Sequence, residues 1–214
     1  MMNRIVVTKV VNNDAYKIIT TKFNDFQLNR ITVADESRSI LDNIYVGKVK
    51  NVIKNINAAF IEIENGILCY LELTKMFNPI FLNQKKNDIL VEGDEILVQV
   101  IKEVQQNKQP VVTTSFAIKE DHIILTHGKT NIGISSKIGD LSVKNRIKDL
   151  LTPYSNTDYG FVVRTSAKDV KEEVLINEIN SLVDEYTNII NKANYSTCFS
   201  CIKSTPDTFI CDIK

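Results

Sequence analysis

Arg164 and Thr165 end an apolar, strand-like run that begins at Gly160, and their side chains are suited to binding a phosphate group. A guanidinium can hold two phosphate oxygens at once, and a neighbouring hydroxyl can donate one further hydrogen bond. The alternative is a surface arginine followed by a threonine that precedes a helix. Such side chains can bind an anion, and both interpretations stay open at this point.

Residues that could bind a metal are present, but their spacing is unfavourable. Cys198 and Cys201 alternate along a strand-like piece without a second pair, so buried thiols are favoured over a zinc site. His122 and His127 are expected to point to opposite sides. Two adjacent carboxylate pairs are interpreted as a linker and a solvated helix face: Asp35-Glu36 and Glu172-Glu173. The chain shows no readable carboxylate cluster for magnesium.

Composition describes an ordinary globular chain of 214 residues, with 43% apolar and 24% charged residues. Lys+Arg and Asp+Glu both number 26, so the formal net charge is zero. Any nucleic-acid contact must then come from a local cluster and stacking aromatics. The absence of a long apolar run and of a cleavable leader predicts a cytoplasmic protein that does not associate with membranes, and the few cysteines fit a reducing compartment.

The stretch 43–73 holds three strand-like runs separated by short polar breaks. Gly47 interrupts the first run, where a glycine marks a bulge or a sharp bend, and Gly66 marks a tight hairpin. After an irregular segment over 74–87, alternation resumes at 96–100 and again at 111–113. Five strands closing near Phe116 predict a small antiparallel barrel, and the OB-fold is the commonest such barrel that binds nucleic acid.

The flanking segments are mixed in character. Residues 1–35 alternate and predict three short strands, the third including Phe26, with a turn at 12–14. Residues after the barrel predict strands at 122–125, 133–138 and 160–165 and helices at 143–151 and 168–193. Pro153 ends the first helix, and Ser166 with Asp169 forms a capping box for the second. Two strand-like pieces follow at 198–202 and 208–213, and the chain then reads as cut off.

Five short segments stand in a characteristic order and spacing between residues 39 and 175. They are NIYVGKV at 43–49, AAFI at 58–61, GDEILVQV with the following Lys102-Glu103 at 93–103, GIS at 133–135 and VRT at 163–165. In this order they resemble the N-terminal half of a bacterial endoribonuclease of the ribonuclease E/G family.

The resemblance implies an α+β, mainly β fold with four parts. A five-stranded S1-like OB barrel at 39–116 stands next to an α+β 5′-sensor-like domain at 117–197, with partial RNase-H-like strands at 1–38 and 198–214. The family's DNase-I-like catalytic domain, which holds magnesium, would follow and is absent here. The implied chain therefore needs no cofactor, binds single-stranded RNA without cutting it, and would form a homo-oligomer through the missing C-terminal part.

The resemblance also assigns residues. It implies that Phe60 and Tyr70 stack on RNA bases, that Lys108 contacts the RNA backbone, and that Arg164 and Thr165 bind a 5′-monophosphate, with Ile124 lining that pocket through its backbone. From composition alone, the two rings would be core aromatics and Lys108 a solvated turn residue.

Two positions depart from the family pattern. Glu120, or Lys119 with a shift of one residue, stands where a glycine is expected, and Ser136 replaces a basic residue. A carboxylate repels phosphate, so weak discrimination of the 5′ end is expected. Two other functions remain open: a complete, non-catalytic RNA-binding protein, and an OB module that binds proteins instead of RNA.

Overall fold

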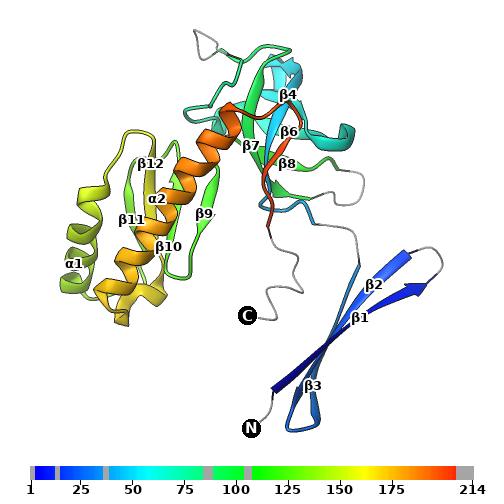
Figure 1. Ribbon diagram of the computed structural model, residues 1–214. Helices are drawn as coiled ribbons and strands as arrows, with labels where there is room; N and C mark the ends of the chain where they lie inside the picture. The colour runs from blue at the N-terminus through cyan, green and yellow to red at the C-terminus, as the bar shows by residue number, and fades with distance from the viewer. Residues whose placement is uncertain (1–2, 13–14, 36–38, 84–88, 104–107, 206–214) are drawn as a thin grey trace. The chain divides into compact units, whose positions relative to one another are not determined.

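The computed structural model describes residues 3–12, 15–35, 39–83, 89–103 and 108–205. The chain divides into two compact units, one of residues 1–40 with 205–214 and one of residues 41–204 (Figure 1). The fold is α+β and mostly β, as predicted, and each unit is described by itself. Among the described residues, no helix is both long enough and apolar enough to cross a membrane.

The first unit contains a three-stranded antiparallel meander of β1 (Asn3–Asn12), β2 (Ala15–Asn24) and β3 (Gln27–Asp35). Three strands were expected here. Phe26 does not belong to the third strand, however, because Asp25 and Phe26 both have positive φ and form the turn between β2 and β3. The expected turn at 12–14 includes residues outside the described part.

The second unit begins with a closed barrel of five strands, which confirms the predicted strand count. The strands are β4 (Ile44–Ile53), β5 (Ala58–Glu62), β6 (Leu68–Glu72), β7 (Glu95–Lys102) and β8 (Val111–Thr113). They pair in the order β4-β5-β6-β8-β7, and a further β4–β7 pairing closes the barrel. β4 serves two neighbours because its first half pairs with β7 and its second half with β5.

Gly47 lies where β4 changes partners. A Cβ at this position would lie 2.5 Å from Cγ2 of Ile61 on β5, so the two strands can approach this closely only because residue 47 has no side chain. The register shift of β4 falls slightly later, between Val49 and Asn51. The predicted break at Gly66 is a short 3-10 turn, η2 (Glu64–Gly66), in which the glycine has φ +72°.

A four-stranded sheet follows the barrel, in the order β11-β12-β10-β9. Its strands are β9 (Ala117–Lys119), β10 (Ile123–His127), β11 (Ile132–Ile134) and β12 (Tyr159–Val163). Three of them correspond to expected strands, whereas β9 was not predicted. Helices α1 (Leu141–Leu151) and α2 (Glu172–Asn194) share one buried core with this sheet (Figure 1).

The two helices begin and end for different reasons. Asp140 caps α1, because its side chain accepts a hydrogen bond of 2.8 Å from Ser142 N, and Pro153 lies in the 3-10 turn that ends it. The predicted capping box of α2 is wrong. Residues 165–169 form a separate 3-10 helix, η5 (Thr165–Asp169), and the Ser166 hydroxyl donates to Asp121 O.

The last described strand, β13 (Cys201–Lys203), pairs with β4 of the barrel. Lys192 in the last turn of α2 donates to Ile202 O at 2.6 Å, which ties this strand to the helix as well. Residues up to 204 therefore belong to the second unit. The expected domain boundaries at 116 and 197 stay predictions, because one hydrophobic core runs from Ile44 and Leu97 of the barrel into the sheet and both helices.

Candidate functional site

Phe60 on β5 and Tyr70 on β6 stand side by side on the outer face of the barrel. They are direct partners in the β5–β6 ladder, and their ring centroids lie 6.2 Å apart with 75° between the ring planes. Both side chains are half-buried, whereas the alternating residues of the same strands are buried inside the barrel: Ala59, Ile61, Cys69 and Leu71. The two rings, called the ring pair below, are therefore surface groups and not core aromatics.

Charged groups flank the ring pair, and they neutralise one another. Lys50 Nζ lies 3.0 Å from Glu62 Oε2, and Lys75 Nζ lies 2.6 Å from Glu72 Oε2. Each carboxylate stands two positions along its strand from a ring residue, which places it on the same outer face. Hydrogen bonds from Lys75 and Thr74 lower the pKa of Glu72. The face offers aromatic surface with little free charge.

Lys108 lies in the segment that leads into β8, and its side chain is exposed. That segment is attached beside the ring pair, because Pro110 O accepts a hydrogen bond of 2.8 Å from Tyr70 N. Val111 then pairs with Tyr70 in the parallel β6–β8 ladder. The lysine thus lies on a segment next to the rings, and its contact with RNA stays a prediction.

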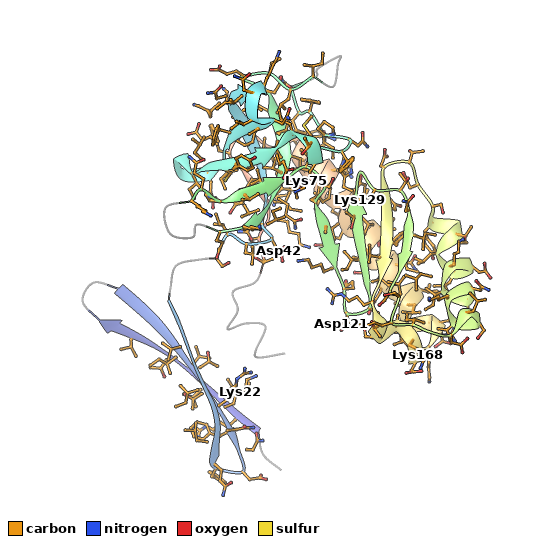
Figure 2. The ribbon with its side chains drawn as sticks, turned by 180° about the vertical axis from the view of Figure 1, so that it is seen from behind. Lys22, Asp42, Lys75, Asp121, Lys129 and Lys168 are labelled. Atoms are coloured by element: carbon orange, nitrogen blue, oxygen red, sulfur yellow. The ribbon has the colours of Figure 1, made fainter. Side chains whose placement is uncertain are left out.

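Arg164 and Thr165 follow β12 directly, at the opposite end of the sheet from the barrel. The guanidinium donates to Asp121 O at 3.4 Å, and the Thr165 hydroxyl lies 2.9 Å from the Ser135 hydroxyl. Figure 2 shows Asp121 and Lys168, near this group, at the end of the sheet far from the barrel. In the part of the chain that the structure describes, no carboxylate forms an ion pair with Arg164. The guanidinium is therefore open to an anion.

Glu120, the residue that departs from the family pattern, is held by α2. Its Oε1 accepts a hydrogen bond of 2.9 Å from the Ser181 hydroxyl, and its backbone N–H donates to Ile123 O at 2.9 Å. The carboxylate thus has a partner of its own, although it still adds a negative charge near the turn that leads to Asp121. Ser136, the second departure, is exposed just after β11.

Ile124 lies on the face of the sheet that the helices leave uncovered. Ile123 and Leu125 are in the core, while Ile124 between them is half-buried and pairs directly with Lys119 and Val162. Because side chains alternate along a strand, the following residues lie on this open face: Lys119, Ile124, Thr126, Gly133, Gly160 and Val162. The structure thus separates the predicted residues into two regions. The outer barrel face with Phe60 and Tyr70 is called the ring face below, and Arg164 and Thr165 with the neighbouring hydroxyls of Ser135 and Ser166, at the far end of the sheet, are called the anion group.

The histidine and cysteine side chains that could bind a metal are wholly or partly buried or have other partners in this fold. His127 is buried, His122 Nδ1 contacts Glu178 Oε1, and Cys198 and Cys201 are half-buried free thiols. Burial raises the pKa of both thiols, which disfavours the thiolate that zinc binding needs. Within the described ranges, no three His, Cys, Asp or Glu side chains are grouped so that they could hold a metal ion.

The sequence reasoning missed two hydroxyls of the anion group. Ser135 was noticed only as part of a matching segment, yet its hydroxyl contacts Thr165. Ser166 was assigned to a helix cap, yet its hydroxyl donates to Asp121 O at 3.2 Å, beside Arg164. A run of small hydroxyl residues next to an arginine is the signal that could have found Ser166. Ser135 depends on the parallel pairing of β11 with β12, which spacing alone does not reveal.

Comparison with known proteins finds relatives of both the barrel and the four-stranded sheet with its helices. A sequence model of the Ribonuclease E/G family matches residues 117–213. Ribonuclease G of Salmonella typhimurium is 25% identical over 176 residues, covering 77% of this chain and 36% of that protein. A Ribonuclease E/G-like protein of Pyropia yezoensis is 30% identical over 171 residues, covering 78% and 33%. Another, of Porphyra purpurea, is 28% identical over 176 residues, covering 80% and 34%.

These matches extend well beyond residues 117–213, so they include part of the chain that precedes the four-stranded sheet. The chain spans about a third of the length of the relatives it matches. The family that the five short segments predicted is confirmed. The chain belongs to the ribonuclease E/G family.

Proposed function

We propose that this chain binds single-stranded RNA on the ring face of its barrel and receives the 5′-monophosphate end at Arg164 and Thr165. The observation that carries the proposal is the ring pair, because two adjacent half-buried rings on an outer strand face offer stacking surface to unpaired bases. Family membership supports the same function. The closed five-strand order supports an S1-like OB barrel at 39–116. The family match over residues 117–213 supports a 5′-sensor-like domain at 117–197.

Stacking is expected to dominate binding at the barrel. The net charge of the chain is zero, and Lys50 and Lys75 are already paired with carboxylates, so few phosphate contacts are available there. Binding that rests on few phosphate contacts depends only weakly on salt. Lys108, exposed beside the rings, is the lysine expected to contact the RNA backbone.

Phe60→Ala is the first test. We expect it to weaken binding of a 5′-hydroxyl single-stranded oligomer by about tenfold, because one base–aromatic stack contributes about 1–3 kcal/mol. Fluorescence anisotropy with a labelled oligomer measures the change. Tyr195→Ala is the matched control, since Tyr195 is 92% exposed and follows α2, outside the β5–β6 ladder that carries the ring pair. Equal affinities of wild type and Phe60→Ala would remove the ring face from the proposal.

The anion group suits a terminal phosphate. An arginine without a carboxylate partner can bind two phosphate oxygens, and the hydroxyls of Thr165 and Ser135, already 2.9 Å apart, can donate further bonds. The Glu120 carboxylate opposes an anion nearby, so the preference for a phosphorylated end should be modest.

Arg164→Ala tests this second part. We expect wild type to bind a 5′-monophosphorylated oligomer about three- to tenfold more tightly than the 5′-hydroxyl form, consistent with one charge-assisted contact. The variant should bind both forms equally. Lys148→Ala, which removes the same unit charge from an exposed position of α1, should keep the preference. A wild type that does not distinguish the two ends would contradict the sensor assignment.

We further propose that the whole protein is a magnesium-dependent endoribonuclease. Magnesium would supply an activated water and neutralise charge on the scissile phosphate, as carboxylate-held metals do in nucleases. The residues of this chain would contribute binding and orientation of the RNA strand: the ring pair holds bases, and Arg164 holds the end. Incubation of this chain with oligomer and magnesium should leave the oligomer intact, whereas cleavage would show catalytic groups within these 214 residues.

A further inference from the structure

A cleft of about 340 Å³ lies on the open face of the four-stranded sheet, at the end nearer the barrel. One wall is Phe77, from the segment between β6 and β7, and the other side is the segment Gly128–Asn131. Thr126, Gly133, Gly160 and Val162 form its floor on the sheet. Figure 2 places Lys129 at this end of the sheet, opposite the end that carries Asp121 and Lys168.

Glycines give the cleft its shape. Segment 129–131 crosses directly over Gly160, where a Cβ would lie 2.5 Å from Asn131 O. The backbone of Phe77 approaches Gly128 in the same way, since a Cβ on Gly128 would lie 2.8 Å from Phe77 O. Asn78 O also accepts a hydrogen bond of 2.7 Å from His127 Nε2, which fixes the Phe77 wall to the end of β10. The two walls are therefore held in place.

The side chains around the cleft are of two kinds. Phe77 is 48% exposed and Val162 is 43% exposed, so the interior offers apolar surface that the fold does not cover. The rim is polar, and in the described part of the chain the side chains of Lys129, Thr130 and Asn131 have no hydrogen-bond or ion-pair partner. One small volume is thus surrounded by apolar and polar groups. The wall is aromatic and the floor apolar, and the rim offers an amide, a hydroxyl and an ammonium group.

We propose that this cleft binds one nucleotide of the RNA strand between the ring face and Arg164. The base would lie against Phe77 and Val162, with its polar edge toward Thr130 and Asn131, and the Lys129 ammonium would contact a phosphate. A volume of about 340 Å³ falls within the usual range for small-molecule sites. This inference rests on the proposed function and extends it to a third contact region.

The position of the cleft favours RNA over other occupants. Val162 in its floor pairs directly with Ile124 on the same open face, and it stands two positions before Arg164 in the chain. A strand that is held at the barrel and reaches Arg164 can follow this face. An apolar peptide would use only the apolar floor, whereas a nucleotide can contact the apolar floor with its base and the exposed polar rim with its base edge and phosphate.

The test uses the whole chain and a 5′-hydroxyl oligomer, so that the Arg164 group contributes no phosphate recognition. Phe77→Ala is expected to weaken binding about tenfold and Lys129→Ala about threefold, in line with one stacking contact and one phosphate contact. The controls are Tyr195→Ala and Lys148→Ala, both at exposed positions outside the cleft. Lys129 is exposed, so its variant keeps the test valid even if Phe77→Ala disturbs folding.

A second readout locates the base. An oligomer with 4-thiouridine, irradiated in complex with the protein, should crosslink to the peptide that contains Phe77 or to residues 129–131. The inference is overturned if Phe77→Ala and Lys129→Ala both bind like wild type, or if crosslinks form only at the ring pair. In that case Phe60→Ala still weakens binding and the proposed function stands. If wild type binds no oligomer at about 50 mM salt, where electrostatic contacts are strong, both proposals fall.

Discussion

Gly160→Ala is expected to lower the free energy of unfolding of the second unit by about 3 kcal/mol, at the upper end of the range for overpacking in a well-packed region. A Cβ at this position would lie 2.5 Å from Asn131 O and 2.8 Å from Asn131 N, and closer still to Lys129 O. These are backbone atoms, which cannot move aside as a flexible side chain can. The segment 129–131 would have to lift off β12.

The measurement is thermal unfolding, where a loss of this size lowers the melting temperature by roughly 6–12 °C for a unit of this length. Gly133→Ala is the matched control, because Gly133 lies on the same open face of the neighbouring strand β11. A Cβ there would meet its nearest atoms at 3.8 Å, an ordinary contact. A melting temperature of Gly160→Ala equal to that of Gly133→Ala would mean that segment 129–131 does not cross β12 as closely as described.

The barrel could be predicted from the sequence because its strands alternate. In β5 and β6 the inward positions are small or aliphatic and the outward positions carry rings and charges, which is the pattern of a half-buried strand. The family resemblance, and not the alternation, predicted that Phe60 and Tyr70 lie on the binding face. Periodicity could not predict the pairing register of β5 and β6, which makes Phe60 and Tyr70 direct neighbours.

Predictions failed where tertiary contacts decide the local structure. The capping box at Ser166 was wrong because the hydroxyl binds Asp121 O, which is distant in sequence. Phe26 was assigned to a strand, yet its backbone takes the left-handed conformation needed by a two-residue hairpin turn, which is rare for a large side chain. Strand β9 has three residues and only one buried side chain, Ile118, too short a pattern to recognise.

The candidate site was predictable in part for a similar reason. Arg164 and Thr165 end a strongly apolar strand, so their place at a sheet end followed from the sequence. Phe77 stands in an irregular segment between β6 and β7, and nothing local shows that its backbone meets Gly128. Sites assembled from loops of different elements depend on long-range packing, which a single sequence does not display.

His127 is expected to make the second unit less stable in acid. The ring is buried against Phe116 and Tyr186, with centroid distances of 4.9 Å and 5.9 Å. Asn78 O can only accept, so Nε2 carries the proton, and Nδ1 of the neutral ring accepts from the Tyr186 hydroxyl at 3.0 Å. Burial lowers the pKa of His127, although the bond to Asn78 O opposes this.

The direction of the pH dependence of stability follows from the lowered pKa of His127. The folded state favours the neutral ring, so the contribution of His127 to stability is complete above the unfolded pKa of about 6.5 and is lost as the pH falls below it. The melting temperature of wild type should therefore fall between pH 7 and pH 5. His127→Phe keeps a stacked ring but removes both hydrogen bonds and leaves the buried Tyr186 hydroxyl unpaired.

We expect His127→Phe to lower the free energy of unfolding by about 2–3 kcal/mol at pH 7, the cost of a buried polar group left without its partner. The variant should also lose part of the acid-induced fall, which urea unfolding at several pH values would measure. His122→Gln is the control, because His122 is the only other histidine of the chain and its loss leaves the His127 contribution in place. If the pH profile of His127→Phe runs parallel to that of wild type, the acid sensitivity comes from other titratable groups and not from this ring.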